Sequence, residues 1–308
     1  MYDTINFRLI TPDPLNTNYL DYVPKYLENV LPPNHWGVVY GYLDGLGVSV
    51  SRHKINIYKG SLCKWYLGDN IQTLTRQNTR QAIERLSDTL HVPMDKARIT
   101  RLDIAHNIIT KHPIDVYLNH FGMLRYATRL PMPHGLYYYQ GDKKFCFYDK
   151  IREQRSKGEP IPELYNGRNV LRYEQRYMRR ISSNLKTEVT GAMLYDEEFY
   201  IRLANIWHDT YIKINKINNA NFNFHAMKTI KNLKNMGLLA LIERMGGEME
   251  FHAQIKEAMQ RGEITPKQAH DIRRAIKMAS QINDSLVVEN DAIAELDKKI
   301  KQAIKFYR

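Results

Sequence analysis

The hydrophobic pattern of this chain changes period once, near residue 182, and that change limits the folds it can adopt. Before residue 182, short runs such as Val48-Ser49-Val50 and Ile55-Asn56-Ile57-Tyr58 alternate as strands do, with Gly and Asp between them. After it, apolar residues recur at helical spacing over 197–216, 224–244, 250–261, 266–282 and 287–306. The pattern predicts an α+β protein: a central antiparallel or mixed sheet with flanking helices in residues 1–182, then an all-helical domain in residues 183–308.

Within the first part, the pattern predicts a strand over 3–9, a β-meander over 37–67 and an amphipathic helix over 78–90. A strand over 97–109 and a short helix over 113–121 follow. Residues 136–140 and 144–148 form a hairpin around Gly141-Asp142. The last elements are a helix over 149–156 and a strand over 170–178.

Net charge indicates the kind of partner. The 308 residues carry a formal charge of +12, which favours a polyanion, either nucleic acid or an anionic membrane. No apolar run approaches the ~18–20 residues that span a bilayer, and no signal peptide is visible, so we expect no membrane association. Two cysteines without metal spacing fit a reducing cytosol, and we expect a cytoplasmic protein.

The first polar strand is Arg101-Leu102-Asp103-Ile104-Ala105-His106-Asn107. Alternation places Arg101, Asp103 and Asn107 on one face and His106 among aliphatic residues on the other. Asp103, with the amide oxygen of Asn107, could ligate a hard divalent cation such as Mg²⁺ or Mn²⁺. An Asp–Arg ion pair on a solvated sheet face is the alternative, and His106 is expected in the core.

The second polar strand, over 171–177, places Arg172, Glu174 and Arg176 on one face. Glu174 is either part of a surface charge ladder or a second metal carboxylate between phosphate-binding arginines. Carboxylates on neighbouring strands would converge on one ion, which would polarise a phosphate and neutralise charge as it develops.

Tyr148 ends a third strand, and Lys150 and Glu153 follow it. A tyrosyl oxygen with a pKa near 10 attacks poorly unless a cation or a polarised phosphate assists it. Lys150 could stabilise the phenolate or contact DNA. Spacing alone leaves three other candidate nucleophiles on the paired strand: Tyr137, Tyr138 and Tyr139.

The ordered motifs R-x-D-x-A-x-N, Y-D-K-x-x-E and L-R-x-E-x-R resemble those of rolling-circle replication initiators. The similarity is to the plasmid Rep_trans initiators and the filamentous-phage II/X replication proteins, and it covers roughly residues 1–180. It implies a five-stranded HUH-like sheet, a divalent metal and a tyrosine that nicks one strand, keeps a 5′-phosphotyrosine link and leaves a 3′-OH. Tyr148 matches the nucleophile, Asp103 and Glu174 match the acidic positions, and Glu153 adds to them. The His-hydrophobe-His pair is absent, which is typical of the divergent branch of this group.

The sequence thus predicts a metal-dependent nicking enzyme with Arg101, Arg172 and Arg176 on DNA, acting on a single-stranded or hairpin origin. No P-loop is visible, so a host helicase would have to open the duplex for a host polymerase. The helical part would bind the origin, self-associate as a homodimer, or do both. Its pair 250–261 and 266–282 fits a helix-turn-helix-like reader or a hairpin that only packs. A conjugative relaxase and a non-catalytic DNA-binding protein are the rival functions.

Overall fold

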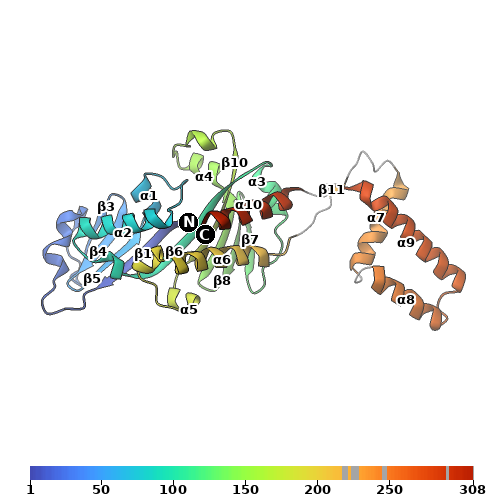
Figure 1. Ribbon diagram of the computed structural model, residues 1–308, viewed down its shortest axis with the longest axis horizontal. Helices are drawn as coiled ribbons and strands as arrows, with labels where there is room; N and C mark the ends of the chain where they lie inside the picture. The colour runs from blue at the N-terminus through green and yellow to red at the C-terminus, as the bar shows by residue number, and fades with distance from the viewer. Residues whose placement is uncertain (217–220, 223–228, 245–247, 289–290, 308) are drawn as a thin grey trace. The chain divides into compact units, whose positions relative to one another are not determined.

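The computed structural model describes residues 1–216, 221–222, 229–244, 248–288 and 291–307 (Figure 1). The chain folds as two compact units. The first contains residues 1–217 and 292–308, and the second contains residues 218–291. This division differs from the expected one at residue 182, because the second unit is an insertion and the chain returns to the first unit after it.

The first unit is built on a ten-stranded sheet in which every pair of neighbours is antiparallel. The strand order is β2-β3-β4-β5-β1-β6-β10-β9-β8-β7. The strands are β1 (Tyr2–Ile10), β2 (Glu28–Leu31), β3 (Val39–Leu43), β4 (Leu46–Ser51), β5 (Lys54–Lys59), β6 (Arg98–Thr110), β7 (Thr128–Met132), β8 (Gly135–Gln140), β9 (Lys143–Asp149) and β10 (Asn169–Tyr177). The meander and the β8–β9 hairpin are confirmed, and the hairpin turns at Gly141, whose φ is +59°.

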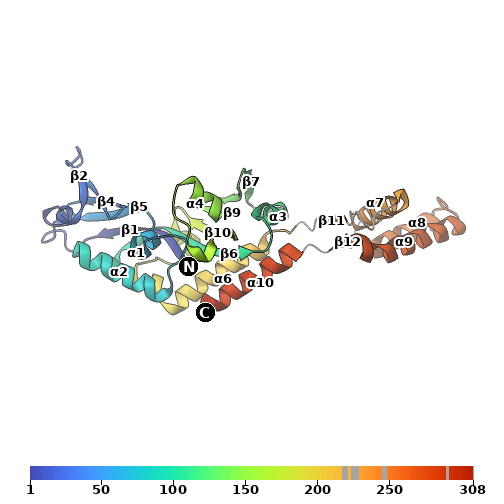
Figure 2. The same cartoon turned by 90° about the horizontal axis from the view of Figure 1, so that it is seen from above.

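The helices of the first unit are α1 (Leu62–Leu67), α2 (Arg76–Leu90), α3 (Ile114–Asn119), α4 (Lys150–Ser156), α5 (Ile181–Leu185), α6 (Glu197–Lys213) and α10 (Asp291–Tyr307). Five 3-10 turns connect them: η1 (Tyr19–Asp21), η2 (Val23–Tyr26), η3 (Met94–Lys96), η4 (Glu163–Tyr165) and η5 (Ala192–Tyr195). Figure 2 shows α2, α6 and α10 in one layer on one side of the sheet, with α4 on the other side. Helix α1 lies beside α2, where Tyr66 donates to Gln81 at 3.0 Å.

Local sequence explains where the main helices begin. Thr75 and Asn78 form a capping box at the start of α2, and Asp196 accepts a hydrogen bond from the backbone N–H of Phe199 at the start of α6. The helix expected over 113–121 is shorter, because Pro113 is its N-cap and His120 its C-cap.

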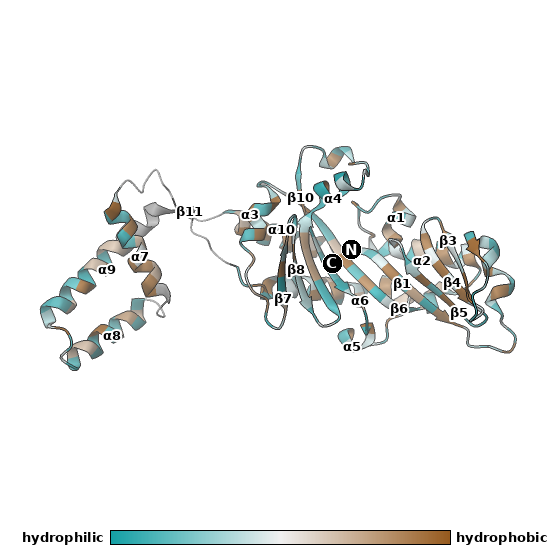
Figure 3. Ribbon diagram, turned by 180° about the vertical axis from the view of Figure 1, so that it is seen from behind, coloured by the Kyte–Doolittle hydropathy of each residue, from teal (hydrophilic) through white to brown (hydrophobic). Residues whose placement is uncertain are grey.

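The sheet face under α6 and α10 is the aromatic core of the first unit. Phe147 stacks on Tyr173 with centroids 4.3 Å apart, and Tyr173 lies 4.6 Å from Trp207 of α6. Helix α10 buries Leu296 and Ile300 in the same core. Figure 3 shows brown, hydrophobic residues alternating with teal ones along the strands. Period-two alternation thus gives this sheet one apolar face and one polar face.

The second unit contains α7 (Ile230–Arg244), α8 (Glu248–Gln260), α9 (Pro266–Leu286) and a short pair of strands, β11 (Asn221–Phe222) and β12 (Val287–Val288). Its core is small and consists of Ile242, Ile255, Ala269 and Ile276 with partly buried neighbours. The expected start of a helix at 224–228 lies outside the described residues. Residues 287–288 form a strand rather than the start of the last helix, and residues 289–290 lie outside the described chain.

The helices of residues 183–308 are divided between the two units. Helices α5, α6 and α10 belong to the sheet unit, because their apolar faces cover the core face of the sheet. Helical periodicity shows that a helix has an apolar face but does not show which surface covers that face.

No helix in the described part of the chain is long and apolar enough to cross a bilayer.

Candidate active site

The three polar segments lie on adjacent strands, and their polar residues share one face. In the β6–β10 register, Asp103 is opposite Arg176 and Asn107 is opposite Arg172. In the β10–β9 register, Arg172 is opposite Tyr148. The faces predicted from alternation are confirmed, and the polar face is the one turned away from the Trp207 core. Here we call this surface, with Arg101, Asp103, Tyr148, Glu174 and Arg176, the polar face of β6–β10–β9.

Glu174 is the centre of this face. Its carboxylate is 2 % exposed and accepts hydrogen bonds from Tyr148 Oη at 2.6 Å, Arg172 Nε at 2.5 Å and Arg176 Nε at 2.6 Å. Burial opposes the charge, but the attraction of the two guanidinium groups outweighs burial and holds the pKa of Glu174 at about 2. Glu174 is therefore a carboxylate at neutral pH.

Tyr148 is the candidate nucleophile that bonds directly to this acid. Burial and the negative charge of Glu174 raise the pKa of Tyr148 well above its ordinary value, although Arg172 works in the opposite direction. The phenol is thus protonated in this arrangement, and its proton points at a carboxylate oxygen.

Arg172 is fully buried, so it is not placed to bind DNA phosphate as the sequence suggested. Besides Glu174, it donates to Asp3 Oδ2 at 2.7 Å, to the carbonyl of Asn70 at 3.0 Å and to Asn107 Oδ1 at 3.1 Å. It therefore acts as the scaffold of the site. Alternation correctly predicted which face of the strand carries Arg172, but it could not predict that this side chain is buried.

Two partners of Arg172 come from segments that the motifs did not include. Asp3 lies at the start of β1, also accepts a hydrogen bond from Ser61 Oγ, and is buried. Asn70 lies in the turn after α1. An acidic residue at the start of β1 was the available signal for Asp3. Nothing in the sequence pattern indicated Asn70.

Asp103 sits beside Glu174 and is also paired with arginine. Arg101 donates to both of its oxygens, at 3.1 and 2.6 Å, and Arg176 Nε lies 4.0 Å from Oδ2. Burial raises the pKa of Asp103 to about 6, against the opposing pull of the arginines. Arg176 thus spans the two acids, and it is partly exposed, as is Arg101.

Lys150 and Glu153 form a separate cluster at the start of α4. The buried Lys150 amine donates to Glu153 at 2.7 Å, Asn70 Oδ1 at 3.0 Å and Gln154 at 3.1 Å. Glu153 also pairs with Lys157. No contact between the Lys150 amine and the Tyr148 hydroxyl is recorded among the described residues. The cation next to the phenol is Arg172.

Oxygen donors suited to a hard cation are present at Asp103 and Glu174. Within the described residues, however, no group of three or more His, Cys, Asp and Glu side chains comes together. Asn107 is held by Arg172 and by the carbonyl of Ile71. The chemistry of the acid pair fits a cation, since the pair already holds one positive group, the guanidinium of Arg176.

His106 lies on the core face, as expected for a core histidine. Its Nδ1 is 2.6 Å from Tyr307 Oη, and its ring meets Trp207 edge-on. Burial lowers the pKa of His106 to about 3, so the ring is neutral at pH 7.

The three other candidate tyrosines lie on two different faces of β8, because side chains alternate along the strand. Tyr138 is buried on the core face and donates to the carbonyl of Gly122 at 2.7 Å. Tyr137 and Tyr139 lie on the other face, under the Lys144 amine, which is 4.3 and 5.0 Å from their ring centroids. Of the four, Tyr148 alone is recorded with a hydrogen bond to an acid.

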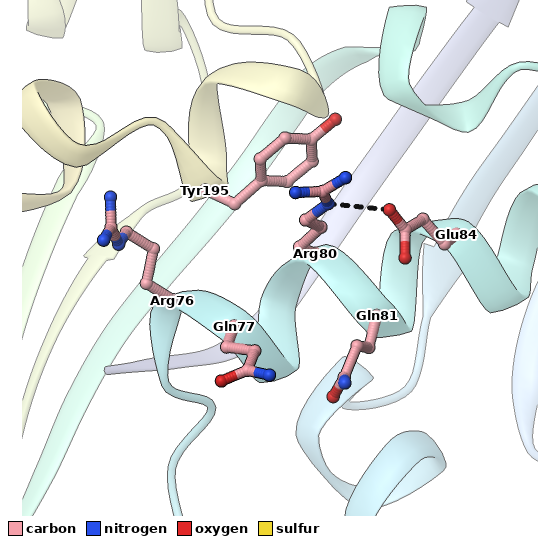
Figure 4. A pocket seen from close by; sticks show the side chains of 6 residues that line it. All are labelled: Arg76, Gln77, Arg80, Gln81, Glu84 and Tyr195. Atoms are coloured by element: carbon pink, nitrogen blue, oxygen red, sulfur yellow. Dashed lines mark hydrogen bonds and ion pairs between the residues drawn. The ribbon is translucent and has the colours of Figure 1, made fainter.

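One cavity adjoins the site, and another lies away from it. One of about 430 Å³ adjoins Tyr148, between the β7–β8 turn and α4. The other, of about 470 Å³, lies on α2 (Figure 4) and is lined by Arg76, Gln77, Arg80, Gln81, Glu84 and Tyr195. In that cavity Arg80 pairs with Glu84 at 2.8 Å, and Arg76 pairs with Glu197 at 2.7 Å. The α2 cavity contains none of the predicted site residues and belongs to the helical layer on the opposite side of the sheet.

The chain matches a known protein family over more than half of its length. The family model Phage_CRI, described as the N-terminal part of a replication-associated protein, matches residues 1–208. A search of curated proteins finds no match. The matched region contains all ten strands of the large sheet and every residue of the polar face.

Proposed function

The chain belongs to this family of filamentous-phage rolling-circle replication initiators, and we propose that it starts replication by nicking one strand of origin DNA with Tyr148. Rolling-circle initiators are nicking enzymes in general. The observation that carries the choice of residue is the 2.6 Å hydrogen bond from the Tyr148 hydroxyl to Glu174, on a strand face that also carries arginines.

In the proposed step, Tyr148 Oη attacks the scissile phosphorus. The Oη–P bond forms, the bond from phosphorus to the 3′ oxygen breaks, and the 5′ end stays on the enzyme as phosphotyrosine. The phenolic proton passes to Glu174, which is within the ~2.6–3.2 Å reach of a general base. The departing 3′ oxygen takes a proton from solvent and becomes the primer end for a polymerase.

The arginines connect DNA binding to this proton transfer. Arg176 and Arg101 are partly exposed, and guanidinium groups bind phosphate in a two-pronged geometry. A phosphate that draws Arg176 away from Glu174 removes one of the two charges that keep the pKa of Glu174 low. The proton affinity of Glu174 then rises when substrate is present, which makes this carboxylate a better base at that moment.

A divalent cation is part of this proposal. Asp103 and Glu174 would hold it, and when bound it would withdraw charge from the scissile phosphate. Arg172, fully buried between Asp3 and Glu174, keeps the acids in place whether or not a cation is present.

We also propose that the sheet is a divergent HUH-like scaffold. The origin would be bound as a single strand or a hairpin, and a host helicase and polymerase would act with the protein. Self-association as a homodimer would bring two polar faces to one origin.

The direct test is a covalent adduct. Wild-type protein would be incubated with a pool of single-stranded oligonucleotides that have a randomised centre, and mass spectrometry would locate the attached nucleotide. We expect attachment at Tyr148, and we expect Tyr148→Phe to lose the adduct by at least about a thousandfold, because the attacking oxygen is gone.

Tyr139→Phe is the matched control, because it removes the same atom from the same face of the neighbouring strand. It should keep the adduct. An adduct that persists in Tyr148→Phe would contradict the proposal and direct attention to Tyr137 and Tyr139. Nicking without any adduct would indicate attack by water.

A further inference from the structure

The turn between β7 and β8 leaves a hollow directly beside the proposed nucleophile. This cavity of about 430 Å³ is within the range of small-molecule sites, which is about 300–1,000 Å³. Its walls combine residues of the turn, two tyrosine rings and the first turns of α4. Its aromatic and apolar lining consists of Met132, Pro133, Tyr137 and Tyr148, together with Gly135.

Gly135 keeps this hollow open. It pairs with Tyr148 in the β8–β9 register, so any side chain at position 135 would project next to the phenol. A Cβ built on Gly135 would lie 3.0 Å from Tyr148 Cβ and 2.9 Å from the carbonyl oxygen of Phe147. The absence of a side chain here exposes the flank of the Tyr148 ring to the cavity.

The aromatic and apolar walls suit a flat ring. Tyr137 and Tyr148 supply aromatic rings, and Met132 and Pro133 supply apolar contacts. On the α4 side the charges balance in part, because Arg152 lines the cavity with two acids, and one of them, Glu153, pairs with two lysines. Stacking on aromatic rings is how proteins hold the bases of single-stranded DNA.

We propose that this cavity holds the nucleobase of a nucleotide next to the scissile phosphate, taken out of its stack. The inference rests on the proposed nicking by Tyr148 and names the substrate as single-stranded or looped DNA. A base in the cavity would fix the sugar–phosphate backbone at the mouth, beside the Tyr148 hydroxyl. Extrusion from a duplex breaks stacking and pairing, so an unpaired base is preferred.

The test uses abasic nucleotides. Adducts of the wild-type protein with the randomised single-stranded pool are sequenced to find the broken linkage, and an abasic residue is then placed at each position around it. We expect about a tenfold lower adduct yield for one of the two positions flanking the linkage, the scale of one stacked base, and small effects elsewhere.

Two substitutions of Tyr137 distinguish the effect of ring stacking from the effect of the hydroxyl group. Tyr137→Phe keeps the ring and should keep the dependence on the flanking base. Tyr137→Leu removes the ring and should lower the yield on the intact strand about tenfold, with no further loss on the abasic strand.

A second measurement does not need the reaction. With Tyr148→Phe protein, 5-iodo-2′-deoxyuridine at the sensitive position should cross-link under ultraviolet light to residues 132–137. Equal tolerance of abasic residues at all positions, or cross-links elsewhere, would overturn the base-binding inference while an adduct at Tyr148 upheld the proposed function. Absence of any wild-type adduct would overturn both.

Discussion

At the scale of single residues, the two acids of the polar face differ in the arginines that they bind. Asp103 is bound by Arg101 and lies within reach of Arg176, whereas Glu174 also holds the fully buried Arg172. We expect Asp103→Asn to reduce adduct formation at least about a hundredfold while DNA binding changes only a few-fold, because a neutral amide is a poor ligand for a cation. Adduct yield and fluorescence anisotropy measure the two effects.

In the wild-type protein, removal of the cation by EDTA should likewise reduce nicking strongly while DNA binding changes only a few-fold. Glu174→Gln should do so too, but with lower stability, because it removes one of the two carboxylates that pair with the buried Arg172, a loss of up to about 3–5 kcal/mol. Full nicking by Asp103→Asn in the presence of EDTA would show that the acids only form a charge ladder.

His106 supplies a pH-dependent residue outside the polar face. Its pKa is about 3 in the folded protein and near 6.5 when unfolded, so the unfolded chain binds the extra proton between these values. Stability contributed by neutral His106 is therefore present above pH 6.5 and decreases toward pH 3, by at most about 1.4 kcal/mol per pH unit. Asp103, whose pKa is raised to about 6, has the opposite effect on stability. Between about pH 6 and 4 its contribution to the free energy of unfolding increases as the pH falls.

The His106 contribution is isolated by comparing wild type with His106→Asn, which cannot titrate but can still hydrogen-bond to Tyr307. Urea unfolding at pH 7 and pH 5 should show a larger stability loss for wild type than for the variant. A variant that loses as much stability as wild type would contradict a buried neutral His106.

At the scale of elements, α10 is the clearest departure from the sequence expectation. It buries Leu296 and Ile300 in the sheet core, and Tyr211 of α6 donates to Asp297 at 2.5 Å. We expect Leu296→Ala and Ile300→Ala each to cost about 2–5 kcal/mol of unfolding free energy in the sheet unit, the usual range for such cavities. Lys301→Ala, on the exposed side of α10, is the control and should change little.

Chemical denaturation followed by intrinsic tryptophan fluorescence suits this test, because Trp207 lies in the same core. If Leu296→Ala unfolds like Lys301→Ala, then α10 is not part of the stable unit.

Local sequence predicted most strands but not every one. β6, β9 and β10 were predictable because apolar and polar residues alternate over their length. β7 was not predicted, because it is a largely exposed edge strand that contains Pro131 and has no apolar period.

The geometry of the site was predicted in part. Asp103, Tyr148 and Glu174 share a face, as alternation predicted. The burial of Arg172 and its hydrogen bond to Asp3 were not predictable, because they depend on a contact between residues 169 positions apart.

At the scale of the whole molecule, the positive charge is unevenly distributed. Residues 218–291 contain ten Lys and Arg against nine Asp and Glu, so nearly all of the +12 charge belongs to the sheet unit. We therefore expect the sheet unit to carry most of the salt dependence of DNA binding. Neutralising one phosphate contact should reduce the slope of log affinity against log salt by about 0.7 for a single strand.

Arg101→Gln and Lys144→Gln, on the polar side of the sheet, should each lower the slope in this way. Arg274→Gln and Lys277→Gln, on α9, are matched changes in the second unit. They should leave the slope of log affinity against log salt nearly unchanged. A larger effect from the α9 pair would show that the helical unit makes the main phosphate contacts.

The insertion of the second unit between α6 and α10 also affects how the protein is made. The ribosome must synthesise residues 218–291 before it reaches the helix that closes the core beside His106, which takes roughly 4–15 s at about 5–20 residues per second. During this interval the nascent sheet lacks Tyr307 and Leu296, and α6 covers its aromatic face without α10. We expect a growing chain to be unable to cut DNA until its last helix has been translated, so that the timing of synthesis itself protects the template from premature breaks.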